Sequence, residues 1–136
     1  MGRIMALDFG EVRTGIAVTD ELQLIASGLT TVKTSEIFAF LTDYLKKERV
    51  ECIVIGEPKQ MDGTPSESET PIRPFIKGLT RAFPTIPIKR QDERFTSKMA
   101  LDTMIAGGVR KKKRQDKAVV DKISATLILQ AYLDRI

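Results

Sequence analysis

Acidic side chains at three separated places could do chemistry in this chain of 136 residues, which contains no histidine. Asp8 ends an apolar stretch near the N-terminus, and Asp121 lies in an apolar segment near the C-terminus. Between them, Asp92 and Glu93 follow another apolar stretch. The absence of histidine excludes Ser-His-Asp triads and histidine-containing zinc sites. Carboxylates at the ends of different elements favour a hard cation, Mg²⁺ or Mn²⁺, over zinc.

Each acidic position also has a simpler interpretation. Asp8 fits a turn residue, and Asp92-Glu93 fits an exposed polar loop. Asp121 carries the stronger signal, because on a helical wheel it lies within an apolar stripe, where a charge is costly unless paired or metal-bound. Its alternative role, complementing the helix dipole, does not require that side of the helix. The stripe consists of Ala118, Val120, Ser124, Ala125, Leu127, Ile128, Ala131 and Tyr132.

The basic residues are concentrated in one run. The formal net charge is +4, and outside this run 17 basic residues face 18 acidic ones. A local cationic patch indicates a polyanionic partner such as nucleic acid, although a solvated loop explains it equally well. The run consists of Arg110, Lys111, Lys112, Lys113 and Arg114. Further candidate contacts to a phosphate backbone are Arg13, Lys89, Arg90 and Arg94.

The bulk properties predict one soluble domain spanning residues 1–136. No apolar run is long enough to cross a bilayer, and acidic residues interrupt the N-terminus where a signal peptide would be apolar. A cytoplasmic location is the expectation. Cys52, the single cysteine, lies in an apolar run and fits a small buried hydrophobe.

Hydrophobic periodicity predicts an α/β domain with a mixed sheet. Strands are expected at 3–8, 15–19, about 24–32, 51–56 and 86–90. Helices are expected from a cap at Ser35, from an N-cap at Thr70 with Pro71 following, from Thr96 or Ser97 to Gly107, and from Asp116 to about Arg135. Residues 57–69 lack periodicity and predict a long mobile loop, which in a compact domain is often functional.

Six short motifs occur in order along the chain: Asp8-Phe9-Gly10, Arg13-Thr14-Gly15-Ile16-Ala17, Gly56-Glu57-Pro58, Met61-Asp62-Gly63, Asp92-Glu93-Arg94-Phe95-Thr96, and Asp121 to Ala125 followed by Ile128 to Leu133. Together they resemble the YqgF/RuvX family of RNase-H-like proteins over essentially the whole chain. The family is described as pre-16S rRNA nucleases and, earlier, as Holliday junction resolvases. Two positions depart from the pattern: Glu57 replaces an apolar residue, and Ser124 replaces the first of two alanines.

The resemblance implies a three-layer RNase H-like fold with a mixed five-stranded sheet flanked by helices. It also implies that Asp8, Glu93 and Asp121 are catalytic and bind two divalent ions, Mg²⁺ or Mn²⁺. The expected partner is structured RNA, with branched DNA as the alternative, and the expected assembly is a monomer or weak homodimer without membrane contact.

The leading hypothesis is therefore a metal-dependent nuclease that processes the 5′ end of pre-16S rRNA in ribosome biogenesis. One alternative is a Holliday junction resolvase-like DNA endonuclease. Another is a non-catalytic nucleic-acid or ribosome-associated factor, although a pure binder gains nothing from acids near phosphates. A nucleotide-dependent phosphotransferase of the actin and sugar-kinase type would require a second such domain.

Overall fold

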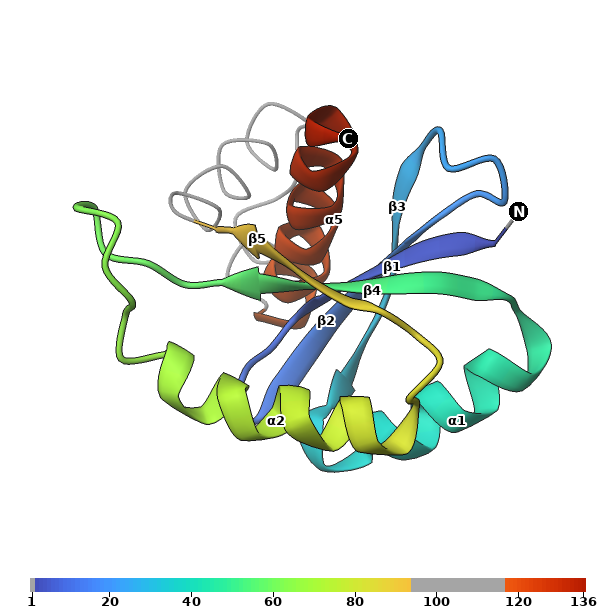
Figure 1. Ribbon diagram of the computed structural model, residues 1–136, viewed down its shortest axis with the longest axis horizontal. Helices are drawn as coiled ribbons and strands as arrows, with labels where there is room; N and C mark the ends of the chain where they lie inside the picture. The colour runs from blue at the N-terminus through green and yellow to red at the C-terminus, as the bar shows by residue number, and fades with distance from the viewer. Residues whose placement is uncertain (1, 94–116) are drawn as a thin grey trace.

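The computed structural model of the chain describes residues 2–93 and 117–136 (Figure 1). Five strands in these ranges form one sheet in the order β3-β2-β1-β4-β5. The strands are β1 (Arg3–Asp8), β2 (Arg13–Thr19), β3 (Ala26–Lys33), β4 (Val50–Glu57) and β5 (Ile88–Asp92). The helices are the 3₁₀ turn η1 (Thr34–Glu36), α1 (Ile37–Lys47), α2 (Glu69–Ala82) and α5 (Lys117–Arg135).

The central strand β1 fixes which residues meet at one edge of the sheet. It pairs antiparallel with β2 and parallel with β4, and β4 pairs parallel with β5. The C-terminal ends of β1, β4 and β5 therefore lie together, next to the start of β2. We call this the carboxyl edge.

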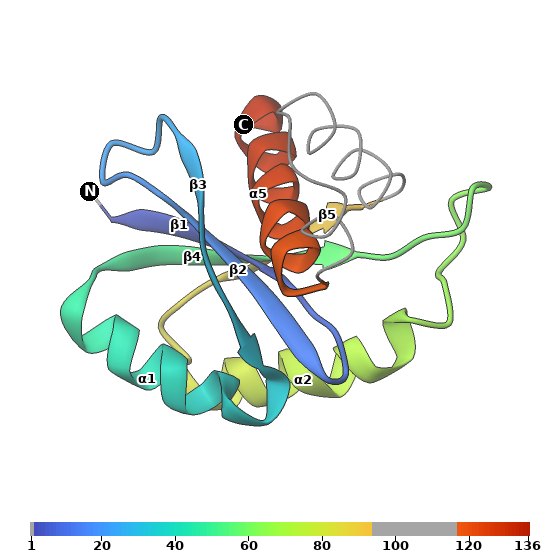
Figure 2. The same ribbon diagram turned by 180° about the vertical axis from the view of Figure 1, so that it is seen from behind.

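Helices cover both faces of the sheet, α1 and α2 on one side and α5 on the other (Figures 1 and 2). Alternation along β1 sends Met5 and Leu7 into the core under α1 and α2, and Ile4 and Ala6 into the core under α5. The alanines among the residues of the second core bring α5 close to the sheet. The mixed sheet between two helical layers confirms the predicted architecture.

Several boundaries differ from the sequence prediction. Strand β2 begins at Arg13 rather than at Gly15, and α2 begins at Glu69 rather than after Thr70. The loop expected at 57–69 has structure of its own, because Lys59 and Pro65 form an antiparallel bridge. On α5, Leu129 is fully buried although the predicted stripe omitted it.

The helix expected from Thr96 to Gly107 lies outside the described residues. Within the described ranges, none of the helices combines the length and apolar character that a membrane span requires.

Candidate active site at the carboxyl edge

Asp8 is the last residue of β1 and lies between two glycines on the α5 side of the sheet. It pairs with Gly15 of β2, and Gly56 of β4 follows directly on Ile55, the partner of Leu7. Asp8 shares its face with the β1 residues that pack under α5, because side chains alternate along a strand. The predicted position at a strand end is thus confirmed.

The two glycines make room for the other candidate carboxylates. A Cβ on Gly15 would collide with the backbone carbonyl of Asp121, and a Cβ on Gly56 would collide with the Glu93 carboxylate. The same Cβ on Gly56 would lie 2.8 Å from Cδ1 of Ile128 on α5. The absence of two side chains therefore brings α5 and Glu93 against the strands that flank Asp8.

Glu93 directly follows β5 and is held there by the sheet. Its backbone N–H donates a hydrogen bond of 3.2 Å to the carbonyl of Glu57 at the end of β4. The neighbouring charge of Glu57 is offset by Lys59, whose Nζ lies 3.5 Å from Glu57 Oε1. The sheet thus brings Glu93 to the edge where Asp8 lies, although 85 positions separate them in sequence.

The electrostatics show that these carboxylates repel one another. Burial, together with the negative charges of Glu93 and Asp121, raises the pKa of Asp8 to about 8. The pKa of Glu93 is raised to about 7, mainly by burial; Arg90 opposes the shift, and the charges of Glu69 and Asp92 add to it. Like charges in a partly buried site are unfavourable, and a bound cation would relieve the repulsion between them.

Asp121, in the second turn of α5, is held by Arg13. The Oδ2 of Asp121 lies 3.5 Å from the Nε of Arg13, with 27% and 37% of the two side chains exposed. Within residues 2–93 and 117–136, no three acidic or cysteine side chains have the spacing that holds a metal ion. The structure therefore brings Asp8 near Glu93 and Asp121 but does not gather all three around one point.

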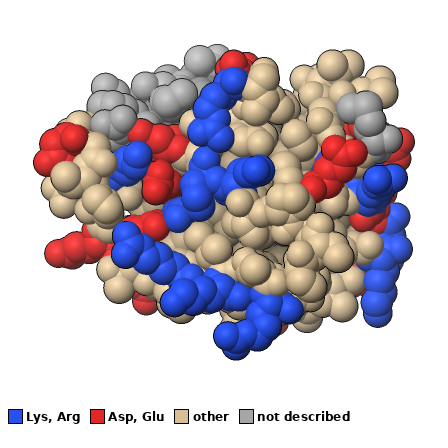
Figure 3. All heavy atoms as spheres, viewed as in Figure 1, with Lys and Arg blue, Asp and Glu red and all other residues tan. Residues whose placement is uncertain are grey.

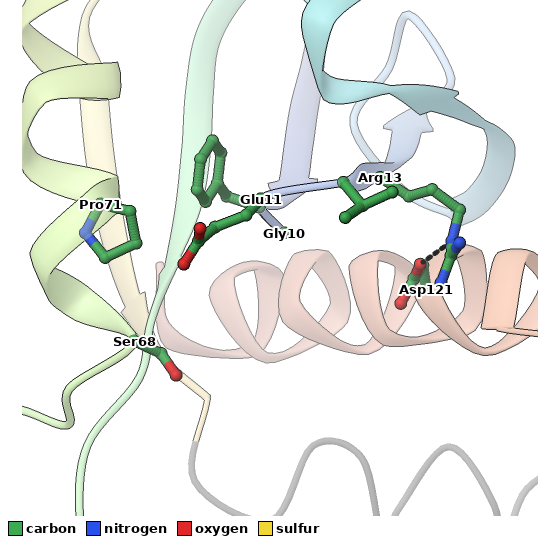
Figure 4. A pocket seen from close by; sticks show the side chains of 8 residues that line it. Gly10, Glu11, Arg13, Ser68, Pro71 and Asp121 are labelled. Atoms are coloured by element: carbon green, nitrogen blue, oxygen red, sulfur yellow. Dashed lines mark ion pairs between the residues drawn. The ribbon is translucent and has the colours of Figure 1, made fainter.

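A cleft of about 380 Å³ opens beside the Arg13–Asp121 pair (Figure 4). Its walls come from the turn between β1 and β2, from the start of α2 and from α5; the lining residues include Glu11, Ser68 and Pro71. The Nε of Arg13 is buried and makes no hydrogen bond within the described structure. An arginine with a loosely held guanidinium at the wall of a cleft can contact an anionic ligand.

Arg90 was predicted to contact phosphate, and that prediction is wrong. Its Nη1 and Nη2 donate to the two carboxylate oxygens of Glu69 at 2.8 and 2.6 Å, and Nη2 also donates to the Gly56 carbonyl at 3.0 Å. Arg90 shares the face of β5 with Ile88, which packs under α2. It therefore ties β5 to β4 and α2 instead of facing solvent.

Sequence reasoning missed Glu69 and the two glycines. Glu69 fell at the end of the predicted loop, although it is buried at the start of α2. Gly15 and Gly56 lie within the motifs that carry the family resemblance, but the room they make for neighbouring groups depends on how α5 packs. The predicted nucleic-acid contacts Arg94, Arg110, Lys111, Lys112, Lys113 and Arg114 lie outside the described residues.

Comparisons with solved structures support the fold. The Thermus thermophilus RuvC structure, solved "in complex with Holliday junction substrate", matches with a TM-score of 0.58 and 19% identity, over 99% of this chain and 96% of that one. The fowlpox virus resolvase, solved with "substrate Holliday junction DNA", matches with a TM-score of 0.61 and 14% identity, over 98% and 97%. These likenesses confirm the RNase H-like fold.

Sequence relatives are much closer. Proteins named "Putative pre-16S rRNA nuclease" are 62% identical in Christiangramia forsetii and 58% identical in Flavobacterium psychrophilum. The first alignment covers 98% of each chain, and the second covers 99% of this chain and 98% of the relative. Residues 2–135 match the family described as "RuvX: Holliday junction resolvase". The chain belongs to the RuvX family.

Proposed function

We propose that this protein is a metal-dependent nuclease that hydrolyses phosphodiester bonds and processes the 5′ end of pre-16S rRNA. The names of the close relatives and the membership of the RuvX family support the activity and the substrate. Ribosomal RNA processing in a bacterial cell would place the protein in the cytoplasm, as the sequence analysis expects.

The observation that carries the proposal is the position of Asp8. Its carboxylate lies at the carboxyl edge between Gly15 and Gly56, where the charges of Glu93 and Asp121 contribute to its raised pKa. Oxygen ligands of this kind suit Mg²⁺ or Mn²⁺. Divalent cations bound there would supply positive charge beside a phosphodiester and lower the pKa of an attacking water.

The side chains of this chain would divide the remaining work. Asp8, in the central position, and Glu93 and Asp121 on either side would hold the cations. Arg13 already neutralises Asp121 at 3.5 Å, and at the wall of the cleft it would contact a phosphate of the substrate. Arg90 would hold the ends of β4 and β5 in place through the Gly56 carbonyl.

The test is a cleavage assay with Mn²⁺ or Mg²⁺ on a labelled RNA carrying the 5′ precursor extension of 16S rRNA. We expect Asp8→Asn, Glu93→Gln and Asp121→Asn each to reduce cleavage to background. Asp43→Asn is the matched control, because Asp43 is an exposed carboxylate on α1 paired with Lys47 at 3.2 Å. Cleavage that survives all three site substitutions in highly purified protein would refute the site assignment.

A four-way DNA junction in the same assay tests the second candidate function. The description of the matching family and the resolvase-like fold favour this candidate. Metal-dependent cleavage of the junction but not of the RNA would establish a DNA endonuclease instead. Tight binding without turnover on either substrate would identify a non-catalytic factor on a nuclease fold.

A further inference from the structure

Helix α2 carries positive charge along its outer side. Its sequence, ETPIRPFIKGLTRA, contains one acidic residue, Glu69, which is buried and paired with Arg90. The remaining charged residues are Arg73, Lys77 and Arg81, all of them exposed. We call these three residues the α2 stripe. Figure 3 shows Lys and Arg side chains forming a band on this face, where α2 lies.

Helix geometry aligns the α2 stripe. Residues at i, i+4 and i+8 fall within an arc of about 80° and follow one another in steps of ~6 Å along the axis. The opposite side of α2 packs into the core through Ile72, Phe75 and Leu79. The stripe is therefore a straight row of cations that points away from the protein.

Two of the three cations in the α2 stripe, Lys77 and Arg81, have no acidic residue three or four positions away on their own helix. Like charges spaced four residues apart repel one another and destabilise a helix. Arg73 has a carboxylate near it, Glu69 Oε2 at 3.5 Å, but that carboxylate is already engaged by Arg90. Helix α1, on the same face of the sheet, offsets Lys47 with Asp43 at i−4. A row with this excess of positive charge is suited to a polyanion.

The position of α2 connects the row to the candidate site. Ser68 and Pro71, at the start of the helix, line the cleft together with Arg13 and Asp121 (Figure 4). Arg73 lies one turn further along, and the row leads away from the carboxyl edge to Arg81. A polyanion whose phosphate reaches the carboxylates could continue along this helix.

We propose that the α2 stripe binds the phosphate backbone of the RNA substrate outside the cleaved bond. The inference rests on the proposed function for the identity of the ligand. Contacts of this kind fix the position of the nucleic acid and contribute affinity that falls with salt, without reading its sequence. The α2 stripe thus contributes RNA-binding affinity that does not depend on the carboxylates.

The test measures RNA binding without turnover. The probe is a fluorescent RNA hairpin with a single-stranded 5′ extension, titrated in EDTA at several salt concentrations. The variant replaces Arg73, Lys77 and Arg81 by Gln. The matched control replaces Lys46, Lys47 and Arg49 by Gln, since these exposed residues in the last turn of α1 and just after it carry the same charge, and one of them is also ion-paired.

We expect the α2 variant to bind the RNA about tenfold more weakly or worse, with the slope of log K against log salt reduced in magnitude by about 2. The control should stay within about twofold of the parent protein and keep more of the salt slope, because its charges lie off the RNA path. Equal losses in the two variants would overturn the proposal, as would a loss confined to a DNA hairpin of the same sequence.

Two further measurements keep the result interpretable. Circular dichroism melting checks that the α2 variant is folded, and the single reversal Lys77→Glu should weaken RNA binding if the triple variant is unstable. With Mn²⁺ present, the α2 variant should raise KM more than it lowers kcat. Because binding is measured without cleavage, an inactive protein would refute the proposed function while leaving the binding contrast as a separate result.

Discussion

Two arginines near the carboxyl edge interact with carboxylates in opposite ways. Arg90 grips Glu69 through two hydrogen bonds of 2.8 and 2.6 Å, and the Glu69 side chain is only 6% exposed. Arg13 faces Asp121 at 3.5 Å, and both side chains are partly exposed. The first pair is a bidentate clamp, whereas the second is a loose contact at the wall of a cleft.

This difference separates a structural arginine from one available to a ligand. Removing one partner of a buried pair leaves an uncompensated charge, but an exposed pair contributes little to stability. The acids follow the same division, because Arg90 lowers the pKa of Glu69 while burial raises the pKa of Asp8 to about 8. The proposed chemistry therefore lies at Asp8 and the loosely paired Asp121 rather than at the Arg90–Glu69 clamp.

The largest expected effect is on the Arg90–Glu69 clamp. Arg90→Ala should lower the free energy of unfolding by about 3 kcal/mol, because the buried Glu69 carboxylate then keeps only the more distant Arg73, at 3.5 Å, as an ion-pair partner. Urea unfolding monitored by circular dichroism measures the change. The double variant Arg90→Met, Glu69→Leu should recover much of the loss. A cost below ~1 kcal/mol for Arg90→Ala would mean that the clamp is no stronger than an exposed pair.

An effect of opposite sign is expected at Asp8. Asp8→Asn should raise the melting temperature of the metal-free protein at pH 8 by at least ~3 °C, about the shift that 1 kcal/mol produces in a domain of this size. The folded state holds the Asp8 proton more tightly than the unfolded chain, since its pKa rises from 3.8 to about 8. The parent protein should therefore lose stability as the pH rises through that range.

Thermal melts in EDTA between about pH 5 and pH 8, where the folded protein holds the Asp8 proton and the unfolded chain has lost it, check both statements. Asp43→Asn serves as the control, because its carboxylate is exposed. Added Mn²⁺ should stabilise the parent protein and have little effect on Asp8→Asn. A melting temperature that Asp8→Asn leaves unchanged or lowers in EDTA would show that this carboxylate is already compensated.

The smallest effect on stability is expected at Arg13. Arg13→Gln should change the free energy of unfolding by less than ~1 kcal/mol, because both members of its ion pair are partly exposed. The same substitution should lower kcat/KM for RNA cleavage by about tenfold, the loss expected for one charge-assisted hydrogen bond to phosphate. A large loss of stability with normal cleavage would show that Arg13, like Arg90, has a structural role and does not contact the substrate.

Much of the fold could be predicted from the sequence because its signals are local. The alternation in β1 and the apolar run in β4 predicted strands, and the positions of Asp8 and Glu93 at the ends of different elements led to the expectation of a shared cation site. Arg90 was wrongly predicted to contact phosphate, although the pattern of its strand indicates which side of the sheet it faces. Ile88 marks the side that packs under α2, and a residue two positions later shares that side.

Other features depend on packing that no local pattern reveals. Glu69 is buried because Arg90 approaches it from a strand 21 positions away in sequence. The spacing of Arg73, Lys77 and Arg81 was visible in the sequence, but only the buried opposite side of α2 shows that they form one exposed row. Asp121 was expected to face the core, and the structure shows it half-buried and paired with Arg13.

The glycines at positions 15 and 56 determine how the spacing of the carboxylates at this edge could be changed. Neither has a side chain, yet each defines how near a neighbour comes to Asp8. A single added methyl group at either position would act as a spacer that widens the gap between acids without altering one of them. The separation of the carboxylates is thus adjustable from two chemically inert positions in the strands.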